Sequence, residues 1–206
     1  MTTTRLPLLP RRGLIGAATL LALPALAAAP SGIGLVEAVE GEATAEAGGA
    51  RRRLGPPMPL FDGEVVATAE ASRARLRLAE TIEIRLGAGV RLRIDRFLAR
   101  AGGTLVLERG AMLADRRAPA NGPPPGLAVR SPFGLIAVRG TRFFAGPSNG
   151  VFGVFVERGA VLLAGADQAV EVLPGFGADI AQPGAAPTTP ARWGAPRIAA
   201  ALASVG

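Results

Sequence analysis

Two pairs of acidic residues are the part of this 206-residue sequence whose spacing could do chemistry by itself. Asp62 and Glu64 stand two apart, and Glu80 precedes Glu83 by three. Residues two apart on a strand share a face with Cα atoms about 6.5 to 7 Å apart, so Asp62 and Glu64 could converge like the carboxylates of a glycosidase. A sugar cleft would also need aromatic and amide groups, but the sequence has one Trp, no Tyr and no Asn or Gln cluster. A carboxylate-based hydrolase is therefore only a remote alternative.

Four residue types that most catalytic sites use are absent. All 23 basic residues are arginine, and the sequence contains no Lys, His, Cys or Tyr. These absences exclude Ser-His-Asp triads, Schiff-base lysines, cysteine nucleophiles, disulfides and metal sites with His or Cys ligands. The acidic residues are too scattered for a calcium loop. We therefore expect a protein that is not an enzyme and that has no cofactor and no metal site.

The N-terminus has the pattern of an export signal. Arg11 and Arg12 precede an uncharged apolar stretch at residues 13–29, which is shorter than the roughly 20 residues of a membrane-spanning helix. Small residues around Ala27 predict cleavage there, so that residues 1–27 are removed and the product is periplasmic or secreted. The paired arginines fit both the twin-arginine and the general secretion route, and both stay open. Cleavage would leave 20 arginines against 16 acidic residues, a formal charge of +4.

The central sequence alternates in the way that is typical of half-buried strands. In residues 73–78, 82–86 and 90–94, even-numbered positions are apolar and odd-numbered positions are mostly charged. The breaks at residues 79–80 and 87–89 have the length of hairpin turns, and Gly41 predicts a first hairpin between flanking strands. We expect further strands at Leu35–Val39, Glu42–Ala47, Thr104–Leu107, Leu127–Val129, Gly134–Val138, Val151–Val156, Ala160–Leu163 and Ala169–Leu173.

These patterns predict an all-β fold, namely a twisted β-roll or β-sandwich of short antiparallel strands and hairpins over residues 28–181. A repeated pattern supports it, because residues 105–113 and 154–162 both contain an apolar strand, Glu-Arg-Gly and a second apolar strand. Glycine takes positive φ readily, so a turn is expected in each copy. Residues 182–206 form a Pro- and Ala-rich C-terminal tail, whose last residues either dock as a helix or fray.

Several short motifs resemble one known family. They are Gly34-x-Val36-x-x-Val39-x-Gly41, Leu60-x-x-Gly63-Glu64-Val65-Val66-x-Thr68, Val129-Arg130-Ser131-Pro132-Phe133-Gly134, Val138-Arg139-Gly140-Thr141-Arg142-Phe143 and Val154-x-Val156-x-x-Gly159-x-Val161. Together they are similar to the periplasmic domain of the FecR-type iron-dicitrate transport regulators, which also occurs as a stand-alone exported module. The regulators of this family that control a sigma factor carry a cytoplasmic region and a membrane helix before this domain. Here the expected export signal precedes it, so the resemblance does not imply anti-sigma activity.

The family motif itself fits a structural role better than a ligand site, because glycine within a strand usually marks a bulge or a close backbone approach. A ligand site remains the alternative. The motif residues are Pro132, Gly134, Arg139, Gly140, Thr141, Phe143 and Gly159.

A row of arginines on the wet face of the alternating strands is the candidate binding surface, with a salt-paired, solvated face as the alternative. The row comprises Arg73, Arg75, Arg77, Arg85, Arg91 and Arg93. An aromatic content of 4% is too low for the base stacking of nucleic-acid sites.

The sequence therefore predicts a non-enzymatic binding or scaffold module of the cell envelope, whose ligand is a protein or an anionic cell-wall or glycan polymer. The alternative is a periplasmic signalling component linked to transmembrane regulation of the iron-siderophore type. We expect no nucleic-acid partner and no membrane span in the mature form, and the oligomeric state is left open.

Overall fold

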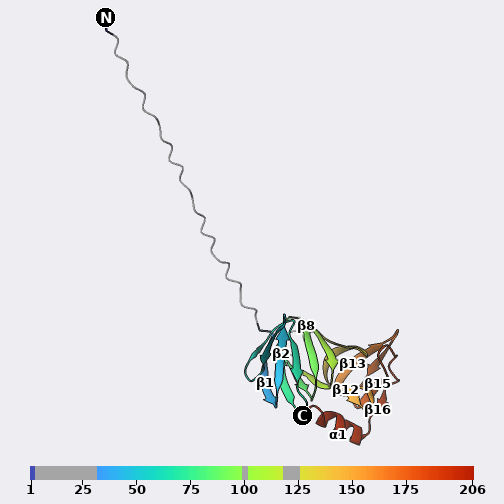
Figure 1. The fold of residues 1–206 in the computed structure, drawn as a ribbon. Helices are drawn as coiled ribbons and strands as arrows, with labels where there is room; N and C mark the ends of the chain where they lie inside the picture. The colour runs from blue at the N-terminus through green and yellow to red at the C-terminus, as the bar shows by residue number, and fades with distance from the viewer. Residues whose placement is uncertain (3–31, 99–101, 118–125) are drawn as a thin grey trace.

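The structure is a computed structural model that describes residues 1–2, 32–98, 102–117 and 126–206, apart from the side chains of Leu98 and Arg139. The predicted cleavage site near Ala27 and the apolar stretch before it lie outside the described residues. The described chain is mostly β-structure with one short helix (Figure 1). Its strands are β1 (Gly34–Glu40), β2 (Ala43–Ala47), β3 (Ala50–Arg53), β4 (Pro59–Leu60), β5 (Val65–Thr68), β6 (Arg73–Leu78), β7 (Ile82–Leu86), β8 (Arg91–Leu98), β9 (Gly102–Arg109), β10 (Met112–Arg116), β11 (Gly126–Ser131), β12 (Gly134–Ser148), β13 (Val151–Gly165), β14 (Gln168–Val172), β15 (Phe176–Ile180) and β16 (Ala191–Arg192), and its helix is α1 (Ala195–Ala203).

The strands form one continuous sheet that folds over on itself as two arms. The first arm contains β3, β2, β5, β8, β9, β11, the N-terminal half of β12, the C-terminal half of β13, and β14. The second arm contains β4, β1, β6, β7, β10, the other halves of β12 and β13, β15 and β16. The sheet is not closed, and the all-β prediction is confirmed. One pair, β9 with β11, is parallel.

The two arms enclose one apolar core. Even-numbered residues of the alternating strands point inward, so that Leu76 and Ile84 of the second arm share this core with Leu92 and Ile94 of the first. All four are fully buried. At about 25 cal/mol per Å² of apolar surface, burial of this kind is the main favourable term in the stability of a chain that has no disulfide.

The long strands β12 and β13 pass from one arm to the other at a shared bend. The register of β12 against β13 shifts between Arg139 and Phe143. Gly140 and Gly159 have φ of +62° and +81° at this bend, where one extra residue on a strand makes a bulge. The second Glu-Arg-Gly copy is thus a bulge inside one continuous strand, and not a turn, whereas the first copy separates β9 from β10.

Two of the expected hairpins are wrong, because the chain changes arms where a hairpin turn was predicted. Around Gly41, β1 pairs with β4 and β6, while β2 pairs with β3 and β5. At residues 87–89 the N–H of Gly87 donates to Ala111 in the second arm, and β8 then pairs with β5 and β9 in the first. A short Gly-rich break therefore allows a crossover between sheet arms as well as a hairpin.

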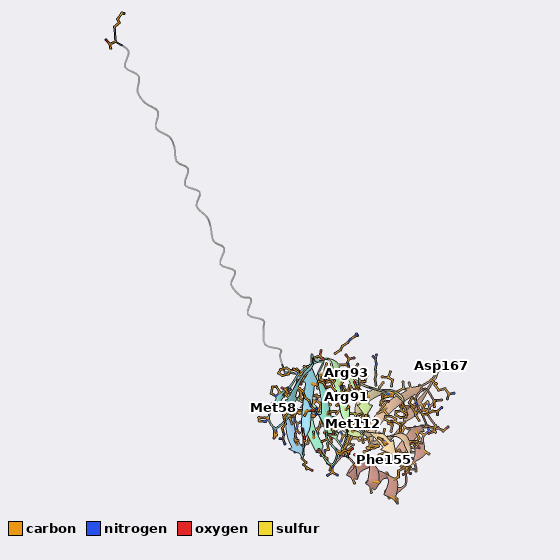
Figure 2. All side chains as sticks on the ribbon, in the orientation of Figure 1. Met58, Arg91, Arg93, Met112, Phe155 and Asp167 are labelled. Atoms are coloured by element: carbon orange, nitrogen blue, oxygen red, sulfur yellow. The ribbon has the colours of Figure 1, made fainter. Side chains whose placement is uncertain are left out.

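The hairpin between β6 and β7 does form, and it uses two non-glycine residues with positive φ. Ala79 and Glu80 have φ of 46° and 60°. Such backbone costs about 1 kcal/mol for a residue with a Cβ. We expect Glu80→Gly to raise the free energy of unfolding by about 1 kcal/mol in urea denaturation. The control is Asp167→Gly at the exposed tip of the β13–β14 hairpin (Figure 2), where φ is not positive and glycine should destabilise the protein. If both variants change the free energy of unfolding in the same direction, the positive φ is not the reason.

The C-terminal residues cover the outer face of the second arm, so the docked helix is the arrangement found. Trp193 is 8% exposed and stacks on Phe155, with ring centroids 5.3 Å apart. Ala201 and Val205 complete a second small core with Leu113 and the ring of Phe155. Figure 1 shows α1 beside β12, β15 and β16. Among the described residues, no helix is both long and apolar enough to span a membrane.

Candidate functional site

The six candidate arginines divide between the two arms. Arg73, Arg75 and Arg77 lie on β6 and Arg85 lies on β7, all on the outer face of the second arm. Arg91 and Arg93 lie on β8 of the first arm (labelled in Figure 2). The crossover at residues 87–89 causes this separation, which strand alternation cannot reveal.

The four arginines of the second arm surround a surface groove. Its larger part, about 530 Å³, runs over β1, β6 and β7 and is lined by Leu35, Val36, Glu37, Pro56, Pro57, Arg75, Arg77, Glu83 and Arg85. A smaller hollow of about 150 Å³ continues toward the C-terminus and is lined by Ala38, Glu40, Arg73, Ala74, Arg75, Arg85, Val205 and Gly206. Arg75 and Arg85 line both parts. We call this surface, with its four arginines, the arginine groove.

Arg75 and Arg85 stand directly opposite each other on neighbouring antiparallel strands. Side chains in this arrangement have Cβ atoms about 4.5 to 5.5 Å apart, and like charges there are destabilising. Arg85 is compensated by Glu83 at 2.9 Å and by the carbonyl of Gly206 at 2.9 Å. Among the described residues, the one ionic partner of Arg75 is Glu37, at 3.4 Å, a carboxylate that also pairs with Arg77. The middle of the groove therefore has an incompletely neutralised positive charge.

The two arginines of the first arm are more fully neutralised. Glu108 lies 2.7 Å from Arg91 and 2.6 Å from Arg93, and Arg91 also lies 3.6 Å from Glu46. The hydrogen bond from Arg93 is the main cause that lowers the pKa of the Glu108 carboxyl below its ordinary value, with burial opposing it. A solvated, salt-paired face describes this pair well.

The lowered pKa of Glu108 predicts a small pH dependence. A carboxyl whose pKa is lower in the folded state contributes stability above its unfolded pKa of about 4.3, and this stability is lost as pH falls through the folded pKa. Because the pair is exposed, the effect is modest. We expect Glu108→Gln to lower the urea midpoint at pH 7 and to match the unsubstituted protein near pH 3. An equal gap at both pH values would contradict the pairing.

The family-motif residues lie at the bend of β12 and β13 and at the turn before β12. Thr141 is fully buried and donates to the carbonyl of Ala160 at 2.8 Å. Phe143 is buried in the main core. Pro132 and Gly134 belong to the β11–β12 turn, where Ser131 Oγ accepts from the N–H of Gly134 at 3.2 Å. The side chain of Arg139 lies outside the described residues. A structural role for this motif stays a prediction.

Thr141 offers a direct test of that interpretation. Thr141→Val keeps the side-chain shape but removes the donor to Ala160, so we expect the free energy of unfolding to fall by about 1 to 2 kcal/mol. Thr44→Val is the matched control, since the hydroxyl of this buried residue makes no side-chain hydrogen bond in the part of the chain that the structure describes. Equal costs for both variants, measured by urea denaturation, would contradict the role of the Thr141 hydroxyl.

Three of the four acidic residues considered for catalysis bind groups of the protein through their carboxylates. Asp62 Oδ1 accepts from the N–H of Phe97 at 2.6 Å, and Glu64 Oε2 accepts from Arg52 at 2.9 Å. Glu83 pairs with Arg85 in the arginine groove. Asp62 and Glu64 lie in the turn before β5, and not on a strand as the hydrolase alternative required. Within the described ranges, no group of three acidic side chains is placed to hold a metal ion.

Comparisons with known proteins agree with the fold and the motif at its bend. A family profile described as FecR protein matches residues 64–162, which include β5 to β12 and most of β13. Residues 64–162 of this chain belong to the FecR family. No curated protein sequence matches the chain.

Two solved structures are similar to this chain. Both are crystal structures of a candidate anti-sigma factor from Parabacteroides distasonis, at 1.65 Å and 2.50 Å resolution, with a TM-score of 0.56 and 14% identity. The matches cover 67% of this chain and 64% or 63% of the other. At this identity the likeness shows the fold, and this chain spans about two thirds of the length of the structures it matches. Both α1 and Trp193 lie beyond the end of the FecR segment.

Sequence reasoning missed part of the groove. Glu37 on β1 and the Pro56–Pro57 segment line it, although neither was singled out. The signal that could have found Glu37 is its charge in the middle of a strand whose other residues, apart from Glu40 at its end, are apolar or glycine. However, only the pairing of β1 with β6 places it beside Arg75.

Proposed function

We propose that this FecR-domain protein is a non-enzymatic binding module of the cell envelope, and that its arginine groove binds an acidic segment of a protein partner. The observation that carries the proposal is the direct opposition of Arg75 and Arg85 in a groove where Arg75 has only a shared carboxylate partner. A carboxylate placed between the two guanidinium groups would remove their repulsion and form charge-assisted hydrogen bonds.

The mixed charge of the groove favours a polypeptide over a uniform polyanion. Glu37 and Glu83 line the groove together with the arginines, so a polymer with regularly repeated negative charges would meet repulsion as well as attraction. A protein segment can present acidic side chains to Arg75 and Arg85 and apolar groups to Leu35, which is 39% exposed. An anionic glycan or cell-wall polymer is the competing ligand.

The absent residue types support a protein without catalysis. No His, Lys, Cys or Tyr is present in the sequence, and the carboxylates of Asp62, Glu64 and Glu83 have structural partners. The N-terminal sequence supports export of the protein to the periplasm or the medium, since residues 13–29 are apolar, uncharged and preceded by arginines.

A regulatory use of this binding is favoured by the comparisons. Residues 64–162 belong to the FecR family, and the similar solved structures are described as a candidate anti-sigma factor. In this proposal the protein acts in envelope signalling by occupying or presenting the acidic segment of a separately encoded partner.

Affinity capture with matched variants tests the proposal. The protein and two double variants, Arg75→Gln/Arg85→Gln and Arg91→Gln/Arg93→Gln, are immobilised and exposed to an envelope extract of the source cells, and retained proteins are quantified by mass spectrometry. We expect a protein retained by the unsubstituted chain and by the first-arm variant, but reduced about tenfold or more by the groove variant, since a hydrogen bond between charged groups contributes about 1.5 to 3 kcal/mol. Proteins retained equally by all three chains would contradict the proposal. If the unsubstituted chain is retained on cell-wall polysaccharide alone and the groove variant is not, the ligand of the groove is a polymer and not a protein.

A further inference from the structure

We propose that the protein forms a two-fold symmetric dimer through the outer face of β11 to β14 in the first arm. This surface lies on the other arm from the arginine groove, so the inference does not depend on the proposed function. Leu162 and Leu135 are 48% and 38% exposed there, while their strand neighbours Val161, Leu163 and Ile136 are buried. At residues 135–137 of β12 and 160–164 of β13 the sheet is therefore apolar on both of its faces, unlike β6 and β8, whose outer faces are charged.

On this face, each outward residue of β12 has a neighbour directly across on β13, and we call such a pair a row. The strand register places one leucine and one alanine in each row. Ala137 lies beside Leu162 on the neighbouring strand, and Leu135 lies beside Ala164. A two-fold axis parallel to the strands, between β12 and β13, would place β12 of one copy over β13 of the other. Each leucine would then lie over an alanine, in both rows at once. This arrangement alternates large and small residues across the interface, as close packing between two sheets requires.

Surface hollows lie where those leucines would enter. One hollow of about 410 Å³ is lined by Ala137, Ala160 and Leu162, among others. A second of about 420 Å³ is lined by Leu135, Ala164 and Arg130, among others. Thus the alanine that would receive each leucine already lies beside an open space.

The charges at the rim are also complementary to a second copy. Arg130 lies on β11 and Glu171 on β14, at opposite edges of the apolar face, and both are exposed. Neither forms an ion pair within the described part of the chain. The same two-fold axis would bring β11 of one copy over β14 of the other. Arg130 is level with Leu135 and Glu171 with Leu162, so the two charges would be offset by about 7 Å along the strands, a distance that two long side chains can span at both edges of the dimer.

The face is small, which sets the expected affinity. Four strands about 4.8 Å apart with two or three outward residues each span roughly 15 Å in each direction, below the area of a standard stable interface. We therefore expect a reversible dimer with a Kd of about 10 to 100 µM, and not an obligate one.

Sedimentation equilibrium of the protein in the form that the cell exports, at about 5 to 500 µM, tests this dimer. We expect a concentration-dependent monomer–dimer equilibrium whose Kd rises tenfold or more in Leu162→Arg and in Leu135→Arg. Leu35→Arg is the matched control, because Leu35 is 39% exposed on the other arm and its substitution should leave the equilibrium unchanged. Circular dichroism and Trp193 emission confirm that each variant is folded.

Charge exchange gives a second, independent readout. Arg130→Glu and Glu171→Arg should each weaken association, and the double variant should restore it, because the two rim contacts are then reversed in sign. A chain that stays monomeric up to about 500 µM would overturn the proposal. So would a dimer that is unaffected by Leu162→Arg, including one held by another surface.

Discussion

Gly159→Ala should lower the free energy of unfolding by about 3 kcal/mol in urea denaturation. Gly159 has φ of +81°, and an added Cβ would lie 2.7 Å from the carbonyl oxygen of Gly140 and 2.8 Å from Thr141 Oγ1. About 1 kcal/mol comes from the left-handed backbone and the rest from overpacking against backbone that cannot move freely. The expected effect is large because both long strands, β12 and β13, cross from one arm to the other at this bend.

Gly140→Ala is the matched control for that substitution. Gly140 also has positive φ, +62°, but an added Cβ would meet nothing within 4 Å. We expect it to cost only about 1 kcal/mol. If the two variants lose the same stability, the close packing of β12 and β13 at the bend is not what the FecR motif maintains.

Gly177→Ala should displace the C-terminal segment from the second arm. An added Cβ would lie 2.2 Å from Trp193 Nε1, and the ring is held between Phe155 and the Arg197 guanidinium, which is 3.6 Å from the ring centroid. Because the indole cannot shift without losing these contacts, we expect a loss of about 3 kcal/mol and undocking of α1. The main core lies on the other side of the arm and should stay folded.

Fluorescence measures this displacement directly, since Trp193 is the single tryptophan and no tyrosine is present. Its emission should shift to longer wavelength in Gly177→Ala as the ring becomes solvated. Gly55→Ala, where an added Cβ meets nothing within 4 Å, should leave the emission unchanged. Unshifted emission in Gly177→Ala would show that the helix does not depend on this close approach.

The faces of the strands could be predicted from the sequence, but their partners could not. Alternation at residues 73–94 gives the inward position of Leu76 and Leu92 correctly. It cannot distinguish a hairpin, as at residues 79–80, from a crossover, as at residues 87–89, because both need only a short break with permissive backbone. Pairing depends on contacts between distant segments, such as β1 with β6.

The same limit affects the candidate site. Arg75 and Arg85 are brought together because a real hairpin joins their strands, whereas Arg91 and Arg93 are carried to the other arm. Glu108, which neutralises that second pair, comes from β9, and its distance in sequence gives no local signal. The docked helix was left open because Trp193 packs on glycines and aromatic residues of β13 and β15, which no periodic pattern connects to it.

The most direct test of the anion-binding groove is the urea midpoint of the unsubstituted protein and of Arg75→Gln, with and without sodium sulfate at matched ionic strength. Opposed arginines repel each other until an anion lies between them. We predict that Arg75→Gln is slightly more stable than the unsubstituted protein without sulfate, by about 0.5 kcal/mol, and that sulfate removes this advantage. The control Arg91→Gln should respond to sulfate as the unsubstituted protein does. A stability difference between Arg75→Gln and the unsubstituted protein that sulfate leaves unchanged would contradict the arginine groove as an anion site.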